Sequence, residues 1–195
     1  MITVIANDYH VNAVSGVLSH NLEKGMIDGK NIIATREEPD NKVNKVVFAP
    51  NQVYALDIVL STGEGKPKPT EDRVSVFKRD PSVAISLKVA SARQFLSEVD
   101  QKASTFPFGI RSIDSKIAKI GSLECLQKGL ITPYPTIAEK KGAIVAQFKY
   151  TVAILPTGKL QIFTGLPLES IYKPEYSITN EQYSRLSTSP IARKK

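Results

Sequence analysis

The chain has 195 residues, of which 42% are hydrophobic and 7% aromatic, so it is long enough for a full domain with its own core. A single cysteine, Cys125, excludes an intramolecular disulfide and a cysteine-built metal site, and two histidines are too few for a histidine-rich one. The net charge of +7 favours polyanionic partners, and between Glu64 and Gly142 fourteen Lys and Arg residues stand against nine Asp and Glu.

The N-terminal part predicts a helix followed by short strands. Ile2 to Tyr9 is expected to be the end of a helix whose start is missing, because it begins at full hydrophobicity without a capping residue. No apolar run of about eighteen residues and no secretory signal are present, which predicts a place inside the cell. The stretches 15–21 and 26–34 are expected to be short strands or loops. His20 could be a ligand or an acid/base group, but a polar loop residue is the simpler interpretation.

The segment Gln52 to Leu60 predicts a strand with an acid on an apolar face. The two-residue period of a strand places Asp57 beside Val53, Ala55 and Val59. Burial of an unpaired carboxylate is unfavourable, so Asp57 must be paired, protonated or solvated in a cleft. The loop 61–68 that follows is glycine-rich and basic, but it lacks the spacing of a phosphate-binding P-loop and the helix after it.

The middle of the chain changes from the strand period to the helix period. A strand is predicted at 73–78, with 45–48 extended before it, and helices are predicted from about Ser86 and over 114–128. Cys125 is interpreted as a small buried hydrophobe. The apolar stripes assigned to the core are Val89, Ala92, Phe95, Leu96, Val99 and Ala103 in the first helix, and Ile117, Ile120, Leu123 and Leu126 in the second.

The stretch 143–155 (AIVAQFKYTVAIL) predicts a long, strongly buried strand with Lys149 in its middle. Lys149 either lies on a solvated face or snorkels, or it points into a cleft and pairs with an acid, for which Asp57 is the natural candidate. A turn at Pro156 leads back into 160–164, which predicts an antiparallel hairpin. Residues 173–195 are polar and end in Arg-Lys-Lys, so a loose basic tail is expected there.

Several separate stretches between Val14 and Tyr172 together resemble one protein family. They read GVLSHNLEKGMIDGKNII, VYALDIVLSTGEGK, VFKRDPS, FPFGIRS, LECLQ and VAQFKYTVAILPTGKLQI. They are similar to the proliferation-associated, ErbB-three-binding protein family, which includes the curved DNA-binding proteins of fungi. That family is similar to type 2 methionine aminopeptidases of the M24 peptidase family, but its members are non-peptidase homologues.

The resemblance implies an α+β chain that forms the second half of a pita-bread, creatinase/aminopeptidase-like fold. It implies a curved antiparallel sheet with covering helices over residues 1–172, a helical insert at about 78–135, and a basic tail at 173–195. The N-terminal half of the same fold is implied as a partner, but it is absent from this chain.

The resemblance also places the former metal site. Gly16 is followed by Val17 where the enzymes have a ligand histidine, and Asp57 matches a ligand glutamate with a shorter acid. The range Gln147–Lys149 reads QFK where the enzymes have a glutamate in third place. An ammonium repels divalent metals. The resemblance therefore implies a pseudo-active cleft without a metal cofactor and without catalysis, in which Asp57 and Lys149 pair. Its residues are Val17, Asp57, Gln147 and Lys149.

The implied function is association with RNA, ribosomes or curved DNA in ribosome biogenesis, translation or growth regulation. The implied locations are the cytoplasm and the nucleus or nucleolus, with no membrane partner. Phosphate contacts are expected from the basic side chains of Lys66, Lys68, Arg73, Lys78 and Arg79. Two alternatives stay open: a metal-dependent methionine aminopeptidase with residual activity, and a protein-interaction scaffold that uses the vestigial cleft and the insert.

Overall fold

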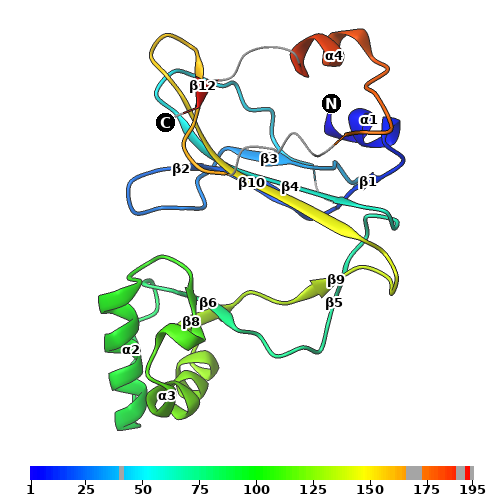
Figure 1. Cartoon of the computed structure of the whole chain (residues 1–195). Helices are drawn as coiled ribbons and strands as arrows, with labels where there is room; N and C mark the ends of the chain where they lie inside the picture. Colours follow the sequence, from blue (N-terminus) through cyan, green and yellow to red (C-terminus); the bar gives the residue numbers. More distant parts are fainter. Residues whose placement is uncertain (40–41, 166–172, 188–191, 194–195) are drawn as a thin grey trace. The chain divides into compact units, whose positions relative to one another are not determined.

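The computed structural model describes residues 1–39, 42–165, 173–187 and 192–193. The chain forms two compact units (Figure 1). Unit 1 comprises Met1–Lys68 and Glu139–Lys195, and unit 2 comprises Pro69–Ala138. The insert expected at about 78–135 lies inside unit 2, which begins earlier and ends slightly later. No helix in the described ranges is long and apolar enough to cross a membrane.

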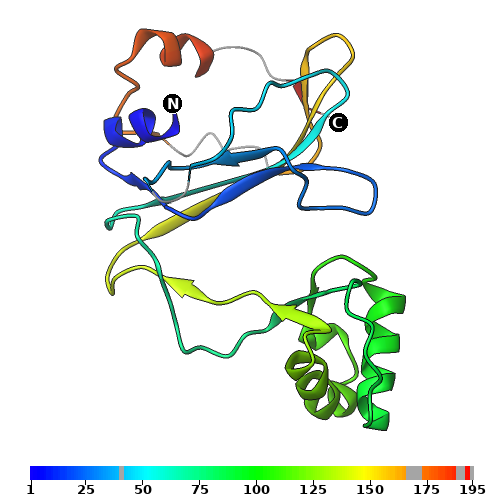
Figure 2. The same cartoon turned by 180° about the vertical axis from the view of Figure 1, so that it is seen from behind.

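Unit 1 is built around one sheet with the strand order β12-β11-β10-β4-β2-β3, and β1 pairs with β4. Among the described residues its pairings are antiparallel, except that of β11 with β12, which is parallel. Figure 2 shows this sheet from behind. The strands are β1 (Asn12–Ala13), β2 (Leu18–Leu22), β3 (Ile32–Ala34), β4 (Val53–Ser61), β10 (Val145–Ile154), β11 (Leu160–Ile162) and β12 (Ala192–Arg193). The predicted strand at 52–60 and the predicted hairpin are therefore confirmed.

Two short helices, α1 (Ile2–Asp8) and α4 (Glu181–Ser187), lie on the same side of this sheet (Figure 1). Asp8 accepts hydrogen bonds from the backbone N–H and the hydroxyl of Thr179, at 2.9 and 2.7 Å, which lower the pKa of Asp8. The Tyr176 ring packs edge-on against His10. Within the expected tail, residues 173–187 thus contain a helix and contacts to Asp8 and His10, while 188–191 and 194–195 lie outside the described residues.

The extended segment expected at 45–48 forms no regular strand. Its one described ring contact joins Phe48 to Tyr54 of β4, with the centroids 5.2 Å apart. This contact places part of the loop between β3 and β4 over the buried ring of Tyr54.

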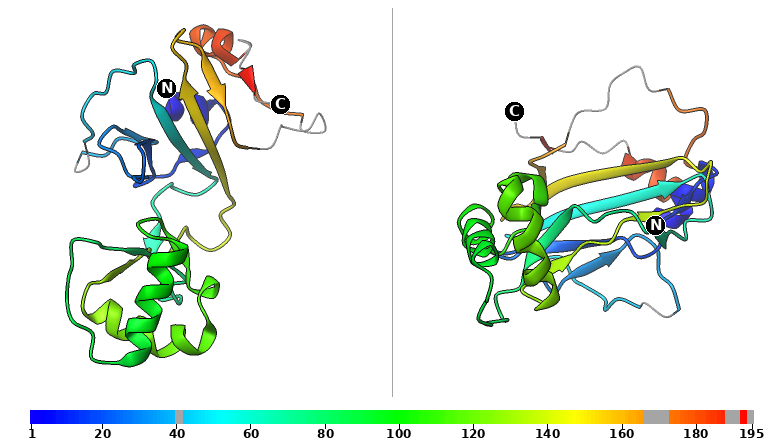
Figure 3. Two further views of the ribbon diagram at one scale, coloured as in Figure 1. Left: turned by 90° about the vertical axis from the view of Figure 1, so that its left-hand side faces the viewer. Right: turned by 90° about the horizontal axis from the view of Figure 1, so that it is seen from below.

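Unit 2 contains two helices of equal length, α2 (Ala90–Lys102) and α3 (Ser115–Gln127), which lie side by side (Figure 3). They are accompanied by a three-stranded antiparallel sheet with the order β7-β6-β8 and by a second, two-stranded sheet, β5-β9. The remaining elements are β5 (Lys68–Pro69), β6 (Val76–Arg79), β7 (Phe108–Gly109), η1 (Ile110–Ser112), β8 (Ile131–Pro133) and β9 (Ile137–Ala138). The strand expected at 73–78 therefore starts three residues later than predicted.

The core of unit 2 forms between α2, α3 and the short strands. The predicted stripe of the first helix is largely confirmed, because Ala92, Phe95 and Val99 are completely buried, although Val89 is exposed. Cys125 is buried as predicted, and desolvation raises its pKa to about 11. The cluster consists of Phe77, Leu87, Ala92, Phe95, Val99, Phe108, Ile113, Ala118, Cys125, Leu130 and Ile131.

The stripe predicted for the second helix is wrong. Of its four members, Ile117 packs against the core, whereas Ile120 and Leu123 are 58% and 59% exposed. The buried face of α3 is made of small residues, Ala118, Gly121 and Cys125. A Cβ on Gly121 would lie 2.5 Å from the Ser91 carbonyl oxygen of α2, so the two helices approach too closely for large side chains between them.

Candidate functional site

The site centres on a charged pair between the two longest strands. The antiparallel register of β4 and β10 sets Lys149 directly opposite Asp57. The Lys149 Nζ lies 3.0 Å from Asp57 Oδ2, which confirms the predicted ion pair. Gln147, one row along the same face of β10, donates from Nε2 to Asp57 Oδ1 at 2.8 Å. Both carboxylate oxygens of Asp57 are therefore engaged by side chains of β10.

The two charges of this pair differ in their exposure to solvent. The Asp57 side chain is 18% exposed and that of Lys149 is 66% exposed. The expectation that the whole of β10 is strongly buried is wrong, since residues 145–149 are exposed and burial begins at Val152 and Ala153. An ion pair with one solvated partner contributes about 0–1 kcal/mol to stability. Its significance therefore lies in the local charge that it neutralises.

The backbone of Asp57 is held by two buried hydroxyl groups. Ser19 Oγ on β2 accepts from the Asp57 N–H at 2.8 Å and donates to the Asp57 carbonyl oxygen at 3.3 Å. Thr35 Oγ1 donates to the same carbonyl at 3.1 Å. Ser19 and Thr35 are each 3% exposed. Neither residue is predicted from the sequence, because a small hydroxyl in a short strand, as at Ser19, or just after one, as at Thr35, has no distinctive spacing.

Val17 is joined to Asp57 through Thr35. The Thr35 N–H donates to the Val17 carbonyl oxygen at 3.1 Å, while its hydroxyl donates to Asp57. Val17 follows Gly16, whose positive φ of 77° turns the chain just before β2. The structure thus brings the chain at Val17, Asp57, Gln147 and Lys149 into one neighbourhood of the sheet.

His20 lies in the adjacent row on the same face of the sheet as Asp57. His20 lies opposite Ala55 of β4, and Ala55 lies opposite Thr151 of β10. Because Ala55 is two residues from Asp57 on β4, both side chains lie on the same face of the sheet. His20 is therefore a strand residue of β2, and its interpretation as a loop residue is wrong. Its Nδ1 is buried and has no hydrogen-bond partner in the described part of the chain. Within those residues, no three His, Cys, Asp or Glu side chains gather as a metal-binding group.

The predicted phosphate-binding residues are divided between the two units. Lys66 and Lys68 are exposed and belong to unit 1, while Arg73 is exposed and belongs to unit 2. Lys78 of unit 2 is half-buried.

Arg79 is engaged by oxygens within unit 2, which argues against the predicted phosphate contact. Its side chain is 13% exposed, and Nε lies 3.3 Å from Asp100 Oδ1 of α2. Nη1 donates to the carbonyl oxygens of Leu130, at 3.2 Å, and Asp80. A guanidinium held by three protein oxygens is a structural residue that joins β6, α2 and the start of β8.

The glycine-rich loop at 61–68 is held by contacts within unit 1. Glu64 pairs with Lys140, and this hydrogen bond lowers the pKa of Glu64 and raises that of Lys140. Asn12 Nδ2 donates to the Gly63 carbonyl oxygen at 2.8 Å. Gly65 has a φ of +69°, and a Cβ there would lie 2.5 Å from the Ala13 carbonyl oxygen. Gly65 therefore serves close packing against β1.

No family model matches the chain. The chain is 35% identical over 192 residues to proliferation-associated protein A of Dictyostelium discoideum, covering 98% of this chain and 50% of that protein. It is 31% identical to the curved DNA-binding protein of Schizosaccharomyces pombe, with 96% and 50% covered. It also matches a methionine aminopeptidase 2-1 of Fusarium vanettenii at 28% identity, with 80% and 35% covered. The chain thus spans about half the length of the curated relatives it matches.

A solved structure of a thermophilic Arx1 superposes with a TM-score of 0.85 and 26% identity, covering 97% of this chain and 51% of that one. The fold and these matches define the class, which is that of the pita-bread, methionine-aminopeptidase-like proteins. Within this class, the chain is a homologue of the proliferation-associated and curved DNA-binding proteins, and the family resemblance drawn from the sequence is confirmed.

Proposed function

We propose that this chain is the second half of a non-catalytic pita-bread protein that associates with nucleic acid and ribosomes. The nucleic acid is RNA or curved DNA, and the process is ribosome biogenesis, translation or growth regulation in the cytoplasm and nucleus. The net charge of +7 supports a polyanionic partner. The name of one homologue, curved DNA-binding protein, supports a nucleic acid as that partner.

The ion pair between Lys149 and Asp57 is the observation that carries the non-catalytic part of this proposal. Asp57 stands where the resemblance places a metal-ligating carboxylate, and the Lys149 ammonium lies 3.0 Å from it. Gln147 occupies the other oxygen of the same carboxylate. A divalent metal needs free anionic oxygens, and a fixed positive charge at this distance opposes its binding. Metal-dependent peptide cleavage at this site is therefore disfavoured.

Nucleic-acid binding is proposed to rest on exposed lysines and arginines that contact phosphates without reading the sequence. Lys66, Lys68 and Arg73 remain in this set, since they are exposed. Each phosphate contact releases counterions, so the affinity should fall steeply as the salt concentration rises.

Two measurements on the full chain test the proposal. Isothermal titration with Mn²⁺ or Co²⁺ should give no binding, and a Met-initiated peptide should stay uncleaved. The Lys149→Glu variant serves as the control, because it restores a carboxylate. Binding of an RNA duplex and of curved DNA should weaken between about 50 and 200 mM salt, and less steeply in a Lys66→Ala/Lys68→Ala/Arg73→Ala variant. Metal binding together with peptide cleavage would overturn the non-catalytic part of the proposal. Nucleic-acid binding whose affinity does not change with salt would overturn the nucleic-acid-binding part.

A further inference from the structure

The outward side of helix α3 carries the large apolar side chains that its inward side lacks. Leu123 lies near the middle of this side, with Ile120 and Leu126 to its left and right on the helical wheel. Leu126 is 38% exposed, and Ile120 and Leu123 are more exposed still. The α3 outer face is defined here by Lys116, Lys119, Ile120, Leu123 and Leu126. An ordinary surface helix places polar residues on this side.

The apolar side chains of the α3 outer face, Ile120, Leu123 and Leu126, do not belong to the core cluster of unit 2. The helix meets α2 through Ala118, Gly121 and Cys125, and the close approach at Gly121 leaves no space for a larger residue. The apolar side chains on the opposite side therefore expose hydrocarbon to water without a folding gain, which is typical of an interaction surface.

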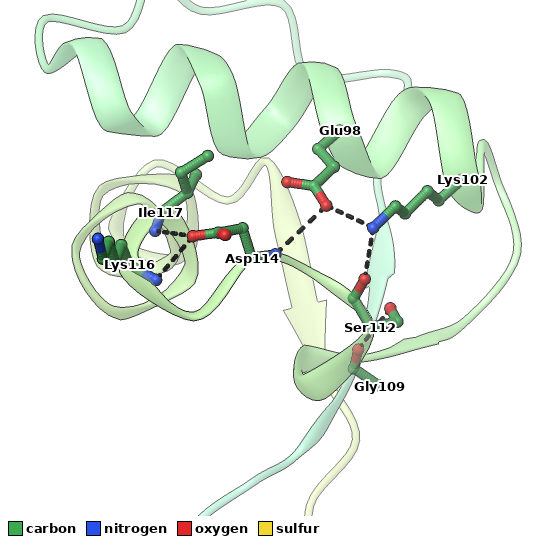
Figure 4. Close-up of polar contacts among 7 residues, drawn as sticks. All are labelled: Glu98, Lys102, Gly109, Ser112, Asp114, Lys116 and Ile117. Atoms are coloured by element: carbon green, nitrogen blue, oxygen red, sulfur yellow. Dashed lines mark hydrogen bonds and ion pairs between the residues drawn. The ribbon is translucent and has the colours of Figure 1, made fainter.

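The N-terminal end of α3 is held by a cap and by contacts to α2 (Figure 4). Asp114 Oδ1 accepts from the backbone N–H of Lys116 at 2.9 Å and from that of Ile117 at 3.4 Å, which caps the helix. Glu98 of α2 accepts from the Asp114 N–H at 3.3 Å and pairs with Lys102. The cap therefore ties α3 to α2.

The charge of the α3 outer face is positive. Among the described residues, no acidic side chain forms an ion pair with Lys116 or Lys119. The acids of the helix and its cap are committed elsewhere. Asp114 caps the helix, and Glu124 accepts from the backbone of α2 and pairs with Lys128 at 3.0 Å. The positive end of the helix dipole adds to the charge beside Lys116.

We propose that the α3 outer face is a docking site for an amphipathic helix of a partner protein, whose apolar stripe is bordered by acidic residues. The apolar side chains at the helical spacings of three and six residues match the stripe of such a helix, and the two lysines match its acids. In the docked complex the acidic residues of the partner helix would lie near the N-terminal end of α3. Its apolar side chains would contact Leu123 and Leu126. This surface shares no residue with the Asp57 site or with the proposed phosphate contacts, so the inference goes beyond the proposed function.

Two other occupants fit the surface less well. In a parallel self-association Lys116 and Lys119 of one copy would face the same lysines of the other, and in an antiparallel one they would face Leu126, so no acid would meet them. A nucleic acid would use the lysines, but it would leave Ile120, Leu123 and Leu126 without an apolar partner.

The test uses the full chain and a designed helical peptide of about 18 residues with one leucine stripe bordered by glutamates. A second peptide has lysines in place of the glutamates. The glutamate peptide should bind and shift the methyl NMR signals of Ile120, Leu123 and Leu126. An Ile120→Gln/Leu123→Gln variant should bind it at least about tenfold more weakly, and the lysine peptide should bind about tenfold more weakly to the unmodified chain.

A matched control separates the docking surface from general hydrophobicity. Leu160→Gln changes a leucine of β11 in unit 1 that is 50% exposed, and it should leave the affinity unchanged. Circular dichroism should show the double variant folded, because both of its changed side chains face solvent. The proposal is overturned if the glutamate peptide fails to bind, if it shifts signals elsewhere, or if it binds the double variant equally well. If sedimentation shows a dimer that the double variant abolishes, the face serves self-association instead. If an RNA oligonucleotide shifts the signals of the same methyl groups and the peptide does not, the face binds nucleic acid instead.

Discussion

Glu124 of α3 accepts a hydrogen bond from the backbone N–H of Val89, at 3.0 Å, just before α2 begins. The same carboxylate accepts from the Lys88 N–H at 2.9 Å, and Lys128 pairs with it. Val89 itself offers no side-chain cap, so an acid from a neighbouring helix satisfies these N–H groups. The carboxylate therefore joins the two helices of unit 2 at their ends.

This cap makes the stability of unit 2 depend on pH. The hydrogen bond from the Lys88 N–H, followed by that from Lys128, lowers the pKa of Glu124 from 4.5 to about 2. A carboxyl whose pKa is lower in the folded state stabilises that state above its unfolded pKa, and this stabilisation is lost as the pH falls from 4.5 toward 2. Glu124→Gln should lower the urea midpoint at pH 7, and the difference from the unmodified chain should shrink in acid. A difference that stays constant from pH 7 to acid would contradict the linkage.

The close packing at Gly121 predicts an asymmetry between the two sides of α3. Gly121→Ala forces a methyl group toward the Ser91 carbonyl oxygen, and it should cost about 1–3 kcal/mol of unfolding free energy. Leu123→Ala, on the exposed side, should change stability by less than about 0.5 kcal/mol. Urea unfolding of both variants measures the contrast. Equal losses would show that the large residues also support the fold.

The sequence predicted that α3 is a helix, but it did not predict which side of this helix is buried. Its apolar residues recur at helical spacing, so the expected stripe comprised Ile117, Ile120, Leu123 and Leu126, of which Ile117 packs against the core. The periodicity of large residues cannot reveal that two helices approach at a glycine, because that approach depends on Ser91 and Phe95 of another element. Tertiary packing thus overrode a correct local pattern.

The Asp57 site was easier to predict, because an acid in an apolar strand calls for a partner and the family resemblance points to Lys149. Asp57 and Lys149 each break an apolar alternation, and the pairing register then places them opposite one another. The hydroxyls of Ser19 and Thr35 were missed, since their contacts replace strand hydrogen bonds at a place where the ladder of β2 ends. A ladder end depends on register, which sequence spacing alone does not give.

A double-mutant cycle should show that the Lys149–Asp57 pair is weak. Lys149→Met keeps the aliphatic stem and Asp57→Asn keeps the shape, so the coupling measures the charge interaction. We expect a coupling of about 0.2–1 kcal/mol that falls with added salt, because Lys149 is largely solvated. A coupling above about 3 kcal/mol would indicate a desolvated pair.

Arg79 and Arg73 should give opposite results when each is replaced by alanine. Arg79→Ala removes the donor of the Leu130 carbonyl and of the half-exposed Asp100, and it should destabilise unit 2 by about 1–3 kcal/mol. Arg73→Ala should leave stability within about 0.5 kcal/mol and weaken nucleic-acid binding. Thermal unfolding and a binding titration on both variants distinguish the structural role of Arg79 from the proposed phosphate contact of Arg73.

Cys125 should be unreactive while the chain is folded. It is completely buried, its Sγ lies 3.7 Å from the Ala92 carbonyl oxygen, and desolvation raises its pKa to about 11. Only the thiolate reacts with disulfide reagents, so labelling should follow the opening of unit 2. Labelling should therefore speed up in Gly121→Ala in proportion to its loss of stability, and rapid labelling of the unmodified chain would contradict the burial.

The position of unit 2 within the chain has a consequence for the order of folding. Strands β4 and β10, the longest pair of the unit 1 sheet, end and begin on either side of unit 2, so their pairing closes a loop that contains that whole unit. Unit 2 has its own core, and β5 and β9 join its two ends, with the Thr70 N–H donating to the Thr136 carbonyl oxygen at 2.9 Å. Once these ends are joined, the effective loop between β4 and β10 is short and its closure costs less entropy. Folding of unit 2 should therefore accelerate formation of the sheet on which Asp57 and Lys149 meet.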